Sequence, residues 1–248
     1  MSGLSGLILV VIFAVLMLGF AALSRRAGRQ PVFRRIEAFA LLPQEVSRAV
    51  EAGKSVHFSL GSGGINGPEA AAAYVGLAML ARIVEMAASS DRPPVVTTGN
   101  GATAILAQDT LRAVYLRQEG RGEYGPTAAQ MVGATPLSYA AGAMAVAGDE
   151  AASLTVLAGS FREDAALVAH AGIGSQAHVL AGTDSPQAQA MFYAVANHPL
   201  IGEELYAAGA YLNAGRLHSA SLQAEDAARW LIVVALLAGT VLKALGAL

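Results

Sequence analysis

Residues 55–69, which read SVHFSLGSGGINGPE, decide the fold of this chain. The run Ser55–Leu60 is compatible with a β-strand, and four glycines follow it between positions 61 and 67. Pro68 and Glu69 then precede an alanine-rich stretch of helical length, and proline is favoured in the first turn of a helix. A strand, a glycine-rich turn and a helix start in this order predict a βα unit, from which parallel sheets are built.

The same order of patterns repeats along the chain. Further β-compatible runs occur at Val95–Thr98, Gln130–Gly133, Leu154–Ala158 and Ala177–Ala181. Alanine-rich helical stretches alternate with the strands at Glu69–Ala88, Ala102–Arg117, Leu137–Ala147, Glu163–Ala171 and Pro186–Asn197. Strands that are buried on both faces read as continuous apolar runs, as LTVLA at 154–158 does. We therefore predict an α/β fold with a mainly parallel, Rossmann-like sheet of about five strands flanked by helices.

Each predicted strand ends in glycine and small polar residues. The carboxyl ends of parallel strands meet at one edge of the sheet, where open α/β sheets bind ligands. Backbone N–H groups in the turn 61–64 are suited to hold a small anion at a helix N-terminus. The same residue types are also ordinary helix caps, so a purely structural role stays open. The candidate ligand-binding residues are His57, Ser59, Gly61, Ser62, Gly63, Gly64, Asn66, Thr98, Asn100, Ser160 and Thr183.

Several familiar kinds of site are disfavoured. The turn reads GxGGxxG instead of GxGxxG, and no acidic residue follows the second strand, which argues against a dinucleotide. Lys54 is the only lysine between positions 37 and 226 and it precedes the first strand, so a Walker A or Schiff-base lysine is absent. Ser62 lacks the first glycine of the nucleophile-elbow motif GxSxG, and Ser160 does not match that motif either. We assign no catalytic residue and expect no cofactor.

Metal and nucleic-acid binding are disfavoured as well. The chain has no cysteine, and its five histidines form neither an HExxH motif nor an i, i+4 pair. We therefore expect no metal site, and we expect His57 and His178 to be strand histidines satisfied inside the domain. Sixteen Lys and Arg against eighteen Asp and Glu leave no basic excess to hold phosphates of a nucleic acid.

Two apolar segments lie at the ends of the chain. Residues 1–24 carry no charged side chain, and Leu4–Leu23 is long enough to cross a hydrocarbon core of roughly 30 Å. Trp230–Leu248 contains one lysine and begins with an aromatic residue suited to the membrane interface. A cleaved signal peptide would carry positive charge before its apolar run, whereas the arginines here follow it. A buried helix of a soluble protein would need a polar face, which Leu231–Leu242 lacks. We predict two transmembrane helices.

The charge distribution predicts the orientation of these helices. Five arginines lie between positions 25 and 35, and by the positive-inside rule they mark the cytoplasmic side. We therefore expect a multi-pass protein of the cytoplasmic (inner) membrane with both termini outside. The predicted parts are an N-terminal transmembrane helix (1–24), a basic juxtamembrane segment (25–36), a cytoplasmic α/β domain (37–226) and a C-terminal transmembrane helix (227–248).

A short helix is predicted after Pro199, in the stretch NHPLIGEELYAAGAYL at 197–212. Leu205, Ala208, Gly209 and Leu212 fall on one face of it. An exposed apolar stripe beside a membrane is a liability, so we expect these residues to contact the membrane-spanning helices or a second copy of the chain. We also expect the protein to be a homo-oligomer, with the second of these contacts formed between its copies.

Three segments carry a resemblance to a known family: HFSLGSGG at 57–64, TPLSYAAGAM at 135–144, and the stretch 197–212 followed by a terminal apolar helix. Together they resemble a family of uncharacterised prokaryotic membrane proteins, catalogued as a domain of unknown function and found notably in Chloroflexus-like bacteria. The resemblance covers nearly the whole chain. It implies a two-span architecture and supplies no chemistry for any residue.

The leading functional hypothesis is a membrane-anchored cytoplasmic module that binds a ligand or serves as a self-associating scaffold, and is not an enzyme. Its expected partners are the lipid bilayer, other copies of itself and a small anionic ligand. The alternative is an enzyme that acts on a phosphorylated or nucleotide-like small molecule at the glycine-rich edge, with His57 and Ser62 taking part. A transporter subunit is weaker, because the two apolar segments contain no acidic residue.

Overall fold

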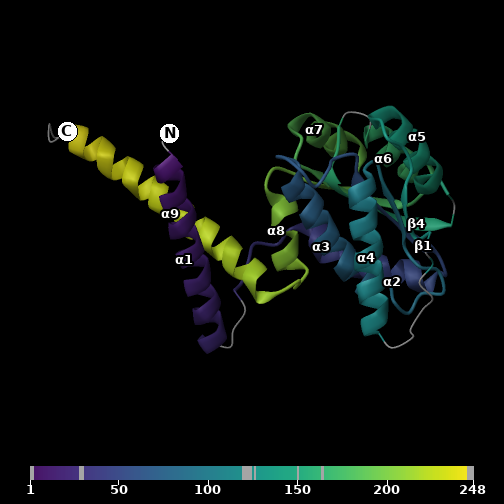
Figure 1. Cartoon of the computed structure of the whole chain (residues 1–248), viewed down its shortest axis with the longest axis horizontal. Coiled ribbons are helices and arrows are strands. Elements are labelled where there is room, and N and C mark those ends of the chain that lie inside the picture. Colours follow the sequence, from purple (N-terminus) through teal and green to yellow (C-terminus); the bar gives the residue numbers. More distant parts are fainter. Residues whose placement is uncertain are drawn as a thin grey trace. The chain divides into compact units, whose positions relative to one another are not determined.

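The computed structural model describes residues 3–27, 31–118, 125, 127–149, 151–162 and 165–244 (Figure 1). Its contacts divide the chain into two compact units. One unit is Arg35–Ala208, and the other combines Met1–Arg34 with Gly209–Leu248. Residues 209–226, which we expected to belong to the α/β domain, thus group with the terminal helices.

A six-stranded parallel sheet forms the centre of the unit Arg35–Ala208. The strand order is β3-β2-β1-β4-β5-β6, which reverses direction between β1 and β4 as in doubly wound α/β folds. The predicted α/β fold is therefore confirmed. The strands are β1 (Ser55–Gly61), β2 (Val95–Thr98), β3 (Ala129–Met131), β4 (Ala152–Ser160), β5 (His178–Thr183) and β6 (His198–Leu200).

Helices cover both faces of this sheet. Helices α2, α3 and α4 pack on one face, and α5, α6 and α7 pack on the other (Figure 1). The helices of this unit are α2 (Glu37–Glu51), α3 (Ala70–Met86), α4 (Gly101–Arg117), α5 (Pro136–Ala147), α6 (Ala165–Gly174) and α7 (Pro186–Val195), and α8 (Glu204–Tyr211) follows β6.

Strand register separates two hydrophobic layers. Phe58 of β1 pairs with Val156 of β4, and both side chains are fully buried. On the other face, Leu157 of β4 joins a core with Phe161 and with Phe192 of α7. The aromatic rings of Phe161 and Phe192 meet edge to face at 5.5 Å between centroids. Burial of the central strands on both faces explains why their sequences are almost continuously apolar.

Two elements were missing from the sequence prediction. Helix α2 contains Pro43, a residue that usually ends or kinks a helix, yet its buried face, including Leu42 and Val46, packs on the sheet. Strand β6 has only three residues and contains Pro199. It lies at the edge of the sheet, where a strand tolerates proline because one of its sides needs no backbone donor.

The second unit contains the two long apolar helices, α1 (Gly3–Ala27) and α9 (Arg216–Ala244), which contact each other. Ser5–Arg26 and Arg216–Ala244 are long and apolar enough to cross a membrane. Most large apolar side chains of these helices are exposed, Leu9 and Leu236 among them. In the same unit the Tyr211 hydroxyl donates a hydrogen bond to the backbone oxygen of Arg34 at 2.6 Å.

Candidate functional site

The carboxyl edge of the sheet carries most of the residues that the sequence singled out. The strand order reverses between β1 and β4, so the loops that follow these two strands lie side by side there. The backbone N–H of Gly63 donates to the backbone oxygen of Ser160 at 3.1 Å, which joins the two loops directly. The loop after β2 joins them too, because the N–H of Gly99 donates to Gly61 O at 2.8 Å.

Glycine is required at two positions of the loop after β1. Gly61 has a φ of +79°, and a Cβ at this position would collide with the backbone oxygen of Ser160. A Cβ on Gly63 would collide with the Ser160 side chain. Gly64 is different, since a Cβ there would lie 3.2 Å from the side-chain nitrogen of Asn100 and only a small adjustment is needed. Gly64 is therefore the residue of this loop at which a side chain can be added with least strain.

Several predicted ligand residues instead hold the edge together. The Thr98 hydroxyl donates to Gly61 O at 3.1 Å and accepts from the N–H of Asn100 at 3.2 Å. Asn100 Oδ1 caps α4 by accepting from the N–H groups of Ala102 and Thr103. The Thr183 hydroxyl accepts from the N–H of Phe161 at 3.0 Å. These side chains fulfil the structural role that the sequence left open for them.

Other polar groups at this edge stay available. The side chains of Ser62, Asn66 and Ser160 make no hydrogen bond within the described part of the chain. Sequence reasoning missed two charged residues beside them, Arg162 and Glu69, whose side chains lie 3.5 Å apart. Their positions in sequence were a usable signal, because Arg162 comes two residues after β4 and Glu69 directly precedes α3.

The N-terminus of α3 also lies at this edge. Helices α4, α5 and α7 are capped by the side chains of Asn100, Thr135 and Ser185, respectively. Glu69 stands at the N-cap of α3 and makes no such capping bond. A helix N-terminus carries partial positive charge, and its first N–H groups need acceptors from elsewhere.

His57 lies in the core and not at this edge. Its Nε2 is 2.8 Å from the Thr97 hydroxyl, which lies 2.8 Å from the Ser59 hydroxyl. The Ser59 hydroxyl is in turn 2.6 Å from the hydroxyl of Tyr139 in α5. Complete burial lowers the pKa of His57 to about 3, because charging the ring would require desolvating the cation. His57 and Ser59 therefore belong to a buried polar network in place of a ligand pocket.

The donors of this network can be assigned from its geometry. Nδ1 of His57 has no partner among the described residues, so the neutral ring is best protonated at Nε2, which donates to Thr97. The Thr97 and Tyr139 hydroxyls then both donate to Ser59 Oγ, and Ser59 donates to the backbone oxygen of Thr97 at 3.2 Å. This assignment leaves only an acceptor lone pair of the ring unsatisfied, which costs less than a buried unpaired donor.

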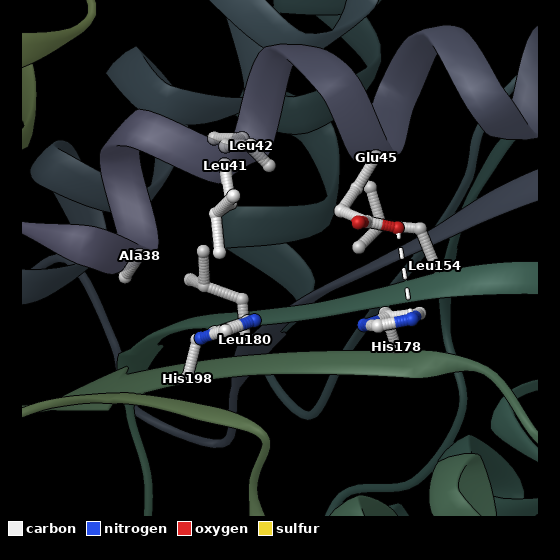
Figure 2. A pocket seen from close by; sticks show the side chains of 8 residues that line it. All are labelled: Ala38, Leu41, Leu42, Glu45, Leu154, His178, Leu180 and His198. Atoms are coloured by element: carbon white, nitrogen blue, oxygen red, sulfur yellow. Dashed lines mark ion pairs between the residues drawn. The ribbon is translucent and has the colours of Figure 1, made fainter.

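A second polar cluster lines a small pocket between α2 and the sheet (Figure 2). Glu45 of α2 lies 3.9 Å from Nε2 of His178 and accepts hydrogen bonds from Arg48 at 3.0 Å. The rings of His178 and His198 are parallel, with 6.4 Å between their centroids. The rest of the lining is apolar: Ala38, Leu41, Leu42, Leu154 and Leu180. Within the described ranges, no three His, Asp or Glu side chains are arranged to hold a metal ion.

The predicted contact patch near Pro199 is largely internal. Leu205 and Ala208 are fully buried, and Leu212 is nearly so. A Cβ on Gly209 would collide with the ring of His218, so this glycine allows close packing within the chain.

A family model described as Domain of unknown function (DUF6754) matches residues 1–248. The chain therefore belongs to this family. No curated protein and no solved structure matches the chain.

Proposed function

We propose that this member of the DUF6754 family is a membrane-anchored α/β domain that binds a small anionic ligand at the carboxyl edge of β1 and β4. The observation that carries the proposal is the reversal of strand order between these strands, where the loop 61–64 meets Ser160. Open α/β sheets bind their ligands at this position, outside the carboxyl ends of the strands.

The available groups at this edge suit an oxygen-rich anion. Ser62 and Ser160 offer hydroxyl groups, and the side-chain nitrogen of Asn100 faces Gly64. The side chain of Arg162 is 61% exposed, so its guanidinium is accessible to a phosphate or carboxylate. The N-terminus of α3, which lacks a side-chain cap, adds favourable partial charge.

Binding is preferred here over catalysis. An enzyme in which His57 acts on Ser62 would need the two side chains to meet, but His57 is 1% exposed and bonds to Thr97 in the core. We also place the ligand site, not self-association, at the centre of the function. Self-association would have to use surfaces other than Leu205 and Ala208, which are already buried.

The two apolar helices support the membrane part of the proposal. Each is long enough for a bilayer, and each exposes apolar side chains that need a nonpolar environment. The five arginines at positions 25–35 favour insertion with both termini outside and the α/β domain in the cytoplasm. The proposed location is accordingly the cytoplasmic membrane.

Thermal unfolding of the full chain in neutral detergent tests the ligand site. Inorganic phosphate, citrate and adenosine diphosphate should be titrated, because they present the same anionic oxygens on different scaffolds. A ligand at one hundred times its Kd stabilises the native state by about 2.7 kcal/mol. We expect at least one of these anions to stabilise the parent protein, and Arg162→Gln to weaken that effect.

Matched variants distinguish binding at the candidate site from a general effect of the protein's charge. Arg117→Gln removes an exposed arginine of α4, which lies 4.0 Å from Glu85 and outside the candidate site. Gly64→Ala adds a methyl group beside Asn100, whereas Gly174→Ala adds one where no atom lies within 4 Å. The proposal is wrong if no anion stabilises the folded parent, or if Arg117→Gln and Arg162→Gln weaken binding equally.

A further inference from the structure

Two buried polar atoms on neighbouring strands have no hydrogen-bond partner among the described residues. They are Nδ1 of His57 in β1 and the hydroxyl oxygen of Thr155 in β4. His57 is 1% exposed and Thr155 is fully buried. The register of the sheet pairs these two residues directly, so their side chains stand next to each other on the same face. The two unpartnered atoms therefore belong to one place in the core.

The hydrogen-bonding roles of the two groups are complementary. Nε2 of His57 is assigned as the donor to Thr97, which leaves Nδ1 as an acceptor, and the hydroxyl of Thr155 has a proton to donate. The two groups make no direct bond in the structure, although neighbouring strands of a sheet lie only about 4.8 Å apart. This arrangement suits one bridging water molecule, which can donate to Nδ1 and accept from Thr155.

The strand pairing is irregular beside this pair of residues. The register of β1 against β4 shifts between Ser55 and Val56, which leaves Ser153 as an extra residue on β4. Such a bulge interrupts the regular ladder. The hydroxyl oxygen of Ser153 is also buried without a partner, so three of the four such side-chain atoms in the described ranges gather at this part of β1 and β4. Native cores satisfy nearly all buried polar groups, and those without a protein partner are satisfied by ordered water.

We propose that one buried water molecule is a structural part of this domain, bound between Nδ1 of His57 and the hydroxyl of Thr155. The water donates a hydrogen bond to Nδ1 and accepts one from Thr155. It thereby holds His57 in the form protonated at Nε2, which the assigned bonds of Thr97, Ser59 and Tyr139 require. Thr155 is a positioning residue, since it acts through the water on His57. This inference is independent of the proposed anion site.

Replacing Thr155 by valine distinguishes a hydrated pair from a dry one, because valine has a similar shape and lacks the hydroxyl. In a dry core the change would remove an unsatisfied buried hydroxyl, so stability would stay the same or rise. If the hydroxyl holds the water, the change deprives the water of a partner and leaves Nδ1 of His57 unsatisfied. We expect Thr155→Val to raise the equilibrium constant of unfolding about five- to thirty-fold in urea titrations of the full chain in neutral detergent.

NMR of the full chain with ¹⁵N-labelled histidine reads the His57 ring directly. We expect the parent to show a proton on Nε2 and a hydrogen-bonded Nδ1, and Thr155→Val to lose the hydrogen-bond shift of Nδ1. Thr155→Ser keeps the hydroxyl and should keep that shift, although the loss of a methyl group weakens packing. Thr110→Val is the matched control, since its hydroxyl donates to Leu106 O within α4 at 2.7 Å, and it should leave the His57 signals unchanged.

A crystal structure of the parent protein at a resolution that shows ordered water completes the test, and it decides the matter even if Thr155→Val does not fold. We expect one water within hydrogen-bonding distance of both Nδ1 of His57 and the hydroxyl of Thr155. A direct bond between these two groups, or a dry contact without water, overturns the proposal. Thr155→Val that is as stable as the parent, or more stable, overturns it as well.

Discussion

Acidification should destabilise the α/β domain through His57. This side chain is completely buried, and burial lowers its pKa from 6.5 to about 3. In the unfolded chain the ring is in water and titrates near 6.5. Below that pH the unfolded state binds a proton that the folded state excludes, so the free energy of unfolding falls as the pH falls.

The magnitude follows from the two pKa values. The free energy of unfolding should decrease by about 1.4 kcal/mol for each pH unit below roughly 6.5, until the pH approaches the folded pKa. Between pH 8 and pH 5 the accumulated loss is about 2 kcal/mol. This is a sizeable share of the 5–15 kcal/mol that is typical of folded domains.

Urea unfolding of the full chain in neutral detergent, followed by circular dichroism at several pH values, measures this loss. His57→Gln keeps a donor that can reach the Thr97 hydroxyl but cannot be protonated. His170→Gln, at an exposed position of α6, is the control for the loss of an imidazole. We expect the parent and His170→Gln to lose about 2 kcal/mol more than His57→Gln between pH 8 and pH 5. Equal losses in all three proteins would refute the assignment of His57 as a neutral core residue.

Three further predictions concern the backbone, the buried network and the membrane topology. Gly61→Ala should destabilise the domain by about 1–3 kcal/mol, because its φ is +79° and its Cβ would meet Ser160 O, whereas Gly174→Ala should stay within about 0.5 kcal/mol in the same urea assay. Tyr139→Phe removes the hydroxyl that lies 2.6 Å from Ser59 Oγ and should cost about 1 kcal/mol in that assay, and an unchanged midpoint would contradict the donor assignment. The chain has no cysteine, so a cysteine at the exposed position of Lys54 should resist a membrane-impermeant maleimide in intact cells, while cysteines added at either end should react. The reverse labelling pattern would contradict the cytoplasmic placement.

The sheet was predictable from sequence because its central strands are short, mainly apolar runs that alternate with stretches of helical length. LTVLA at 154–158 lies inside β4, and the glycine-rich stretch 61–67 begins at the last residue of β1. The peripheral elements were harder to predict. Pro43 and Pro199 normally argue against regular structure, and only the packing of α2 on the sheet and the edge position of β6 make them acceptable.

The candidate site was predictable in place but not in composition. The sequence correctly predicted that the turns lie at one edge of the sheet, because parallel strands end at the same edge. It did not show whether Asn100 caps its own helix, as it does in the structure, or faces a ligand. Arg162 and Glu69 were not among the predicted ligand-binding residues, because their approach to 3.5 Å depends on the pairing of β1 with β4, which are separated by about ninety residues of chain.

The amide NMR spectrum of the full chain in detergent, recorded during a titration with inorganic phosphate, tests the central claim most directly. We predict saturable chemical-shift changes at the amides of Ser62, Gly63 and Gly64, since these lie where the β1 loop meets β4. The amides of Gly53 and Gly174, which lie outside this edge, should not shift. Changes confined to other amides, or no saturable change at residues 62–64, would contradict an anion site at the carboxyl edge of β1 and β4.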